Sequence, residues 1–198
     1  MKNLNKYAAE FLGTFALALV VSLSISGTFP IPTPVLAALT LGLFVYTLGH
    51  ISGTHINPAI TAGALSIGKI SFQNAVAYWI AQFLGAGLAM VVANQMSSSV
   101  SLTVSASPWI GIAEGLGMFF FAFGVASAIY GRTPKDVLGV VVGGSLLLGI
   151  SIAASVSNGV LNPAVALAIG SFNLMYVLGP VAGAVLGMWA YKLISERK

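Results

Sequence analysis

Six stretches of this chain are apolar over lengths that suit a membrane-spanning helix, and this feature constrains the fold more than any other. A helix needs about 20 residues to cross a hydrocarbon layer of ~30 Å. Of the 198 residues, 58% are hydrophobic and only 6% are charged, too few to cover a water-facing surface. The sequence therefore predicts an all-α integral membrane protein, with spans at about 6–26, 34–50, 72–93, 109–130, 137–155 and 173–194.

The basic residues predict the orientation of these spans. If the N-terminus is cytoplasmic, the opposite loops near 27–33, 94–108 and 156–171 hold no Lys or Arg. Cytoplasmic loops are enriched in Lys and Arg. We therefore expect a multi-pass protein of the cell (cytoplasmic) membrane with both termini in the cytoplasm, where all eight basic residues would lie: Lys2, Lys6, Lys69, Arg132, Lys135, Lys192, Arg197 and Lys198.

The composition also excludes several classes of function. The chain has no cysteine, which excludes disulfides, thiolate metal sites and cysteine nucleophiles. The net charge of +4 comes without a basic cluster, so no nucleic-acid partner is expected. No phosphate loop, metal-ligand cluster or nucleophile with a neighbouring histidine and acid occurs. The sequence predicts no enzyme, no cofactor and no metal site.

Two apolar segments are too short to cross the membrane. Residues 58–67 and 163–170 each begin with proline and would rise about 15 and 12 Å as helices, roughly half of the hydrocarbon layer. The first follows the second span and the second follows the fifth span. They are predicted to be half-helices that enter the membrane from opposite faces and meet near its midplane.

Each half-helix begins with the same three residues. An asparagine at the N-cap satisfies backbone N–H groups with its side-chain oxygen, and proline suits the first helical position. The small alanine lets the two tips approach each other. We expect the asparagine amide N–H groups to stay free as donors toward a permeating molecule, at a midplane site made by Asn57, Pro58, Ala59, Asn162, Pro163 and Ala164.

The spacing of two glutamates indicates an internal repeat. Glu10 and Glu114 are 104 residues apart, and Asn57 and Asn162 are 105 residues apart. Three spans in each half give the halves opposite orientations, an inverted repeat of about 1–95 and 105–198 within a single domain, 1–198. A carboxyl group inside a span needs a partner. We expect both glutamates to hold the backbone N–H groups of the re-entrant loops; a proton relay is the alternative.

Beyond these patterns, five motifs stand out: AEFLGTF at 9–15, GHISGTHINPAIT at 49–61, AQFLGA at 81–86, LNPAVAL at 161–167 and LGPVAGA at 178–184. Through these motifs the chain resembles the aquaporin family, the major intrinsic proteins. The resemblance covers essentially the whole chain and implies six tilted helices and two half-helices around one pore per subunit. It also implies a homotetramer in the lipid membrane.

The resemblance also implies an outer selectivity filter of four positions. Counted from the two asparagines, these fall on Ala37, Ile150, Gly159 and Val165. Water-selective members carry an aromatic residue, a histidine and an arginine there, and glycerol facilitators keep the arginine. All three are missing here: the four positions hold alanine, isoleucine, glycine and valine, and the valine stands where the arginine would follow the second Asn-Pro-Ala. We expect a wide, apolar outer filter.

Other pore and packing positions follow from the same frame. Backbone carbonyls before the two asparagines are expected to line the pore as a hydrogen-bonding strip, at Gly53, Thr54, His55, Asn158 and Val160. The side chain of His55 is expected either to line the cytoplasmic half of the pore or to pack. Glycines at 179, 183 and 187 predict close helix packing.

The sequence thus predicts a passive channel for water and small uncharged solutes. Glycerol, urea, ammonia and neutral arsenic or boron hydroxides are the candidate solutes. A secondary transporter is one alternative, because inverted repeats and broken helices also build transporters. A structural membrane protein with a closed pore is the other.

Overall fold

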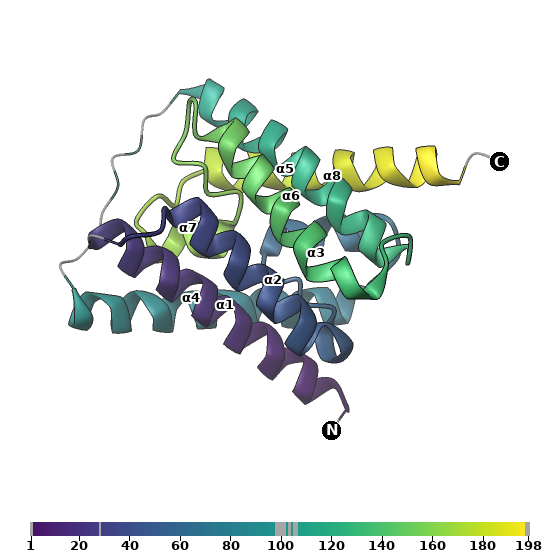
Figure 1. Ribbon diagram of the computed structural model, residues 1–198, viewed down its shortest axis with the longest axis horizontal. Coiled ribbons are helices and arrows are strands. Elements are labelled where there is room, and N and C mark those ends of the chain that lie inside the picture. The colour runs from purple at the N-terminus through teal and green to yellow at the C-terminus, as the bar shows by residue number, and fades with distance from the viewer. Residues whose placement is uncertain (1, 28, 98–101, 103, 105–106, 197–198) are drawn as a thin grey trace.

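The computed structural model describes residues 2–27, 29–97, 102, 104 and 107–196, and the described residues form helices and loops without a strand (Figure 1). Six segments are long and apolar enough to cross a membrane, which confirms the predicted spans. They are α1 (Lys2–Ser26), α2 (Thr33–Ser52), α4 (Phe72–Met96), α5 (Pro108–Ile129), α6 (Leu138–Ala153) with the preceding 3₁₀ turn η1 (Lys135–Val137), and α8 (Met175–Ser195).

The two remaining helices are short and begin with proline, as predicted. Helix α3 spans Pro58–Ser66 and helix α7 spans Pro163–Ala168. Helix α7 ends two residues earlier than the sequence predicted. The reason is Gly170, whose φ of 74° is left-handed, so that the N–H of Ser171 turns back to the carbonyl of Ala166 at 2.9 Å.

The helices pack in an equivalent order in the two halves of the chain. Helix α1 packs on α2 and α4, and α5 packs on α6 and α8 in the same way. Each short helix packs on the last helix of the other half, α3 on α8 and α7 on α4. The two halves are therefore interlocked, and both short helices lie inside the bundle.

Glycines set the closeness of the α5–α8 contact. A Cβ atom at Gly183 would collide with the carbonyl oxygen of Gly115, and one at Gly179 would collide with that of Gly111. Small residues at helix crossings allow backbones to approach closely in membranes. The glycine spacing at 179, 183 and 187 therefore serves helix packing, and all three residues face α5.

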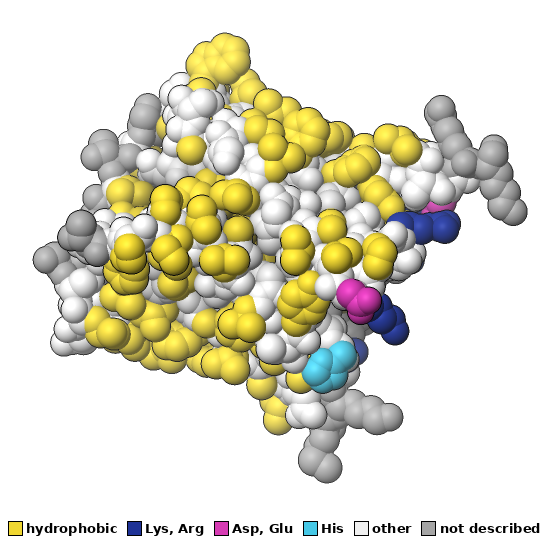
Figure 2. All heavy atoms as spheres, in the orientation of Figure 1, with side chains coloured by type: hydrophobic (Ala, Val, Ile, Leu, Met, Phe, Trp, Pro, Cys, Tyr) yellow, Lys and Arg dark blue, Asp and Glu magenta, His cyan; other side chains and the backbone are white. Residues whose placement is uncertain are grey.

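The surface of the bundle is apolar along the helices. One exposed leucine on each of five helices illustrates this: Leu12, Leu84, Leu116, Leu148 and Leu186. Figure 2 shows hydrophobic side chains spread widely over one face of the molecule. An apolar surface of this extent suits contact with lipid rather than water. The fold is therefore that of a polytopic membrane protein.

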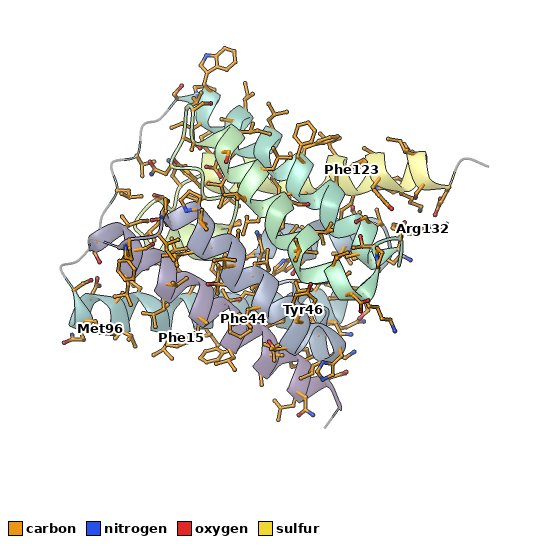
Figure 3. The ribbon with its side chains drawn as sticks, viewed as in Figure 1. Phe15, Phe44, Tyr46, Met96, Phe123 and Arg132 are labelled. Carbon is orange, nitrogen blue, oxygen red and sulfur yellow. The ribbon has the colours of Figure 1, made fainter. Side chains whose placement is uncertain are left out.

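Charged side chains in this view lie toward the end of the bundle that carries both termini (Figures 1 and 2). Arg132 and Tyr46 lie toward that end in Figure 3, and Met96 lies toward the opposite end. Arg197, Lys198 and the side chain of Lys2, which belong to the basic residues used to predict the orientation, lie outside the described part of the chain. The same holds for the middle of the predicted outer loop at 94–108.

Candidate functional site

Asn57 and Asn162 cap the two half-helices with their side chains. The Oδ1 atom of Asn57 accepts hydrogen bonds from the backbone N–H groups of Ala59 at 2.8 Å and Ile60 at 3.5 Å. Asn162 Oδ1 accepts from Ala164 at 3.0 Å and from Val165 at 3.3 Å. Both asparagines have extended backbones, and Pro58 and Pro163 take the first helical position.

The amide nitrogens of these asparagines are not as free as we predicted. Asn57 Nδ2 donates to the carbonyl oxygen of Leu161 at 2.9 Å, and Asn162 Nδ2 donates to that of Ile56 at 3.0 Å. Each asparagine therefore binds the residue that precedes the other one and ties the two tips together. One of the two N–H groups of each amide is used in this way.

The residues just before the asparagines have unusual backbones. Ile56 has a φ of 37° and Leu161 has a φ of 54°, both in the left-handed region. Such a conformation costs a non-glycine residue about 1–3 kcal/mol and persists only where the surroundings hold it. Here it turns the carbonyls of Ile56 and Leu161 toward the opposite asparagine.

Two buried carboxylates bind the strained segments. Glu114 is fully buried, and its Oε2 accepts from the N–H of Leu161 at 2.6 Å while its Oε1 accepts from the N–H of Val160 at 2.9 Å and from Ser157 Oγ at 2.6 Å. In the first half, fully buried Glu10 accepts from the N–H groups of His55 and Ile56 at 2.9 and 2.6 Å. The glutamates thus lie where loop-holding groups would lie.

A cavity of about 220 Å³ lies beside the two tips. Asn57 and Asn162 line it, and so do all four positions that the resemblance assigns to the outer filter. Helix α2 supplies Ala37, α6 supplies Ile150, and the second re-entrant segment supplies Gly159 and Val165. Residues that are 128 positions apart, Ala37 and Val165, therefore meet at one space.

The predicted carbonyl strip is only partly found at this cavity. His55, Asn158 and Val160 line it, whereas Gly53 and Thr54 are not among its lining residues. Gly53 is exposed at the end of α2, and Thr54 is buried with its hydroxyl on the carbonyl of Phe44 at 3.1 Å. Any role of these two residues therefore lies outside this cavity.

The sequence missed most of the apolar wall of the cavity. This wall comes from four long helices, the loop residue Leu102 and the end of α7, and includes Leu17, Val21, Ile25, Leu41, Phe121, Leu146 and Ile169. An apolar residue that faces a pore looks the same in the sequence as one that faces a neighbouring helix. Only the register between helices separates the two.

A set of polar side chains behind the first tip was also missed. Gln82, on α4, binds Glu10 and Thr61, and Thr61 binds the ring of His55. Tyr78 donates to the carbonyl of Ser52 at 2.7 Å. Gln82 lies within the motif at 81–86, and a glutamine in the middle of an apolar span was the signal available in the sequence. In the structure it is fully buried.

The chemistry of the lining is neutral. The lining has no Lys, Arg, Asp or Glu among the residues that the structure describes, and its polar side chains are His55, Thr33 and three asparagines. No group of three or more potential metal ligands occurs in the described part of the chain. The site can therefore offer hydrogen bonds and shape to a molecule, but no fixed charge at the cavity wall.

Six spans, two half-helices that meet tip to tip, and a neutral cavity at the meeting point define a channel-type membrane protein. The chain belongs to the major intrinsic protein family: the model of that family, described as Major intrinsic protein, matches residues 1–191. The proteins of this family are passive channels, which confirms that the chain is not an enzyme.

Individual relatives agree with this family. The chain is 33% identical to Aquaporin NIP1-1 of Zea mays over 96% of this chain and 75% of that protein. It is 30% identical to Aquaporin AqpM of Methanothermobacter thermautotrophicus, over 95% of this chain and 96% of that one. Its structure is similar to that of the aquaglyceroporin from Plasmodium falciparum, with a TM-score of 0.62 and 22% identity over 98% of this chain and 96% of that chain.

Proposed function

We propose that this chain forms a passive channel for water and small uncharged solutes, with a wide, apolar outer filter. The observation that carries the proposal is the lining of the cavity. Ala37, Ile150, Gly159 and Val165 meet there beside the two asparagines, and none of them offers a charge. A permeating molecule would lose much of its water there and keep only a few hydrogen bonds.

The midplane tips would supply the polar contacts of the pore. One amide N–H of Asn57 and one of Asn162 remain after the cross-bonds between the tips. The first-turn N–H groups of α3 and α7 add positive ends of peptide dipoles. A cation would meet these donors without an anionic partner on the wall, which opposes its passage.

The candidate solutes are glycerol, urea, ammonia and neutral arsenic or boron hydroxides, besides water. Two features support solutes larger than water: the short side chains of Ala37 and Val165, and the name of a structural neighbour, an aquaglyceroporin. Ile150 is the bulkiest of the four filter residues and would set the opening from the opposite wall.

The proposal extends to the whole molecule. The chain would be one domain, 1–198, made of two inverted repeats, about 1–95 and 105–198, and would assemble as a homotetramer in the cell membrane with both termini in the cytoplasm. The equivalent packing of α1 on α4 and α5 on α8 supports the repeat. The charged end of the bundle supports the orientation.

Stopped-flow light scattering on proteoliposomes tests the function. We expect flux of water, glycerol and urea above that of empty liposomes, without saturation and without dependence on an ion gradient. Saturable flux that needs an ion gradient would instead indicate a secondary transporter. Flux equal to that of empty liposomes for every solute in the panel would indicate a closed-pore structural protein.

A further inference from the structure

The carboxylate of Glu10 has all of its acceptor positions in use. Its Oε1 accepts from Ser52 Oγ at 2.7 Å and from the N–H of His55 at 2.9 Å. Its Oε2 accepts from the N–H of Ile56 at 2.6 Å and from Gln82 Nε2 at 2.8 Å. Since a carboxylate offers about four such positions, Glu10 is an acceptor toward every neighbour that it binds.

The orientation of the Gln82 amide follows from this acceptor. An amide that meets a carboxylate must present its NH₂ group, because the amide oxygen carries no hydrogen. The same Nε2 lies 3.0 Å from Thr61 Oγ1, so Thr61 receives a hydrogen bond from Gln82. Glu10 and Gln82 come from the packed helices α1 and α4, and both are fully buried.

The hydroxyl group of Thr61 has a single hydrogen and two possible places for it. Its Oγ1 lies 3.2 Å from the carbonyl oxygen of Asn57 and 3.1 Å from Nδ1 of His55. If the hydrogen goes to Nδ1, the contact with Asn57 has no hydrogen. If it goes to the carbonyl of Asn57, the N-cap residue one turn earlier, Nδ1–H of His55 donates to Thr61 and every contact is a hydrogen bond.

We propose that Gln82 and Thr61 are positioning residues that hold His55 in its neutral Nδ1–H form, so that Nε2 presents a lone pair to the pore. His55 lines the cavity, and the Tyr78 ring packs edge-on against the imidazole at 5.3 Å between centroids. Among the described residues, the buried side-chain atoms that lack a hydrogen-bond partner are Thr14 Oγ1, Ser22 Oγ and Gln82 Oε1. Nε2 of His55 is not one of them, which agrees with a position at the cavity.

This proposal rests on the proposed channel function and sharpens its specificity. A bare Nε2 accepts hydrogen bonds, as do the neighbouring backbone carbonyls. The cytoplasmic side of the two tips would then offer acceptors only, and the remaining asparagine N–H groups would be the donors. A solute that carries N–H or O–H groups, such as urea or a polyol, can satisfy this wall while it passes, whereas a solute that only accepts hydrogen bonds cannot.

Nitrogen NMR of the imidazole tests the form of His55 directly. The chain has two histidines, so the exchange His50→Gln at the exposed end of α2 leaves His55 as the single reporter. In ring-labelled protein in lipid nanodiscs at mildly alkaline pH, we expect a protonated Nδ1 and a bare Nε2. A protonated Nε2 in the otherwise unchanged chain, alone or together with Nδ1–H, would overturn the proposal.

Two substitutions of Thr61 separate positioning from packing. Thr61→Val keeps the shape and removes the hydroxyl group, so the Nε2–H form should appear, whereas Thr61→Ser keeps the hydroxyl and should preserve Nδ1–H. Persistence of Nδ1–H alone in a folded Thr61→Val protein would overturn the role of Thr61. Gln82→Met should also weaken the preference, because Thr61 loses the donor that fixes it as an acceptor.

Flux measurements test the consequence for solutes. Loss of one acceptor should lower urea flux relative to water flux in Thr61→Val by about 2- to 10-fold, which corresponds to the net free energy of one hydrogen bond. Thr61→Ser should keep the original ratio. A shifted imidazole with an unchanged ratio would overturn the selectivity, and no flux at all in the unsubstituted chain would overturn the channel function while leaving the NMR result valid.

Discussion

Val165 is the residue at which a single side chain most affects the proposed filter. It is 4% exposed and lines the cavity together with Ala37 and Gly159. Its N–H is bound by the oxygen of Asn162 at 3.3 Å, so its backbone position is fixed by the cap of α7. A longer side chain at this position would project from a rigid base into the cavity.

The substitution Val165→Arg should therefore reduce glycerol and urea flux more than water flux. A guanidinium group adds five donors, a fixed charge and bulk at a position where valine offers neither donor nor charge. It should also reduce any proton leak. Stopped-flow measurements with each solute and a pH-sensitive dye inside the vesicles check both effects.

Val165→Met is the matched control, because it adds length without charge. We expect it to narrow the pore without changing the proton leak. If Val165→Arg lowers water, glycerol and urea flux by the same factor, or if the unsubstituted chain passes water but excludes glycerol and urea, the wide filter is refuted.

The residue scale also shows what a local pattern can and cannot reveal. The capping role of Asn57 and Asn162 follows from the proline after each of them, and the structure has both caps. The use of their amide nitrogens does not follow from neighbours in the sequence. Asn57 and Leu161 are 104 residues apart, and only the meeting of α3 and α7 brings the donor to the acceptor.

At the scale of elements, each re-entrant segment depends on one buried carboxylate. Glu114 binds two successive backbone N–H groups, at Val160 and Leu161, and the second of these residues has a left-handed backbone. The carboxylate of Glu114 therefore binds the segment at the residue whose backbone is strained. Without the carboxylate, the buried N–H groups would have no partner in this segment.

Glu114→Ala should therefore destabilise the protein more than Glu114→Gln does. Alanine leaves two buried N–H groups unpaired, at a cost of about 1–3 kcal/mol each, whereas glutamine keeps one acceptor oxygen. Thermal unfolding in detergent measures the difference, and solute flux shows whether the pore is retained. Equal loss of flux in both variants with full thermal stability would instead favour the alternative role, a proton relay.

The contact between α5 and α8 makes a second prediction at this scale. Gly183→Ala places a methyl group against the carbonyl of Gly115, so the two helices must move apart. Overpacking of this kind costs about 1–3 kcal/mol. Gly87→Ala on α4 is the control, because a Cβ atom there meets nothing within 4 Å and alanine is the better helix former. Equal unfolding temperatures of the two variants would contradict the role of Gly183 in the α5–α8 contact.

At the scale of the whole molecule, the chain offers a direct test of its orientation. It has no cysteine, so a single introduced cysteine is the only reactive thiol. Lys135 and Ser155 are both exposed, the first in η1 before α6 and the second just after α6. They therefore lie at opposite ends of one span.

A membrane-impermeant maleimide should label Lys135→Cys only in inside-out vesicles and Ser155→Cys only in right-side-out vesicles. This outcome follows from placing the Lys and Arg residues in the cytoplasm. Labelling after detergent treatment shows that both thiols are reactive. The reverse pattern would put both termini outside the cell.

The sequence by itself determined the spans, the two half-helix starts and the family. Each depends on residues that are neighbours in the chain: apolar length sets a span, and Asn-Pro-Ala sets a capped helix start. The structure confirms the six spans and both starts at Pro58 and Pro163.

Only the tertiary structure decided which side chains share the pore and which polar groups meet. Three features join segments that lie far apart in the sequence: the hydrogen bond from Asn57 to Leu161, the four donors that bind Glu10, and the apolar wall that includes Phe121. Their contacts depend on how far each helix is shifted and rotated against the next. That register is set by packing between helices, such as the glycine contacts between α5 and α8. The glycine spacing predicts a close contact, but it does not say which helix lies on the other side.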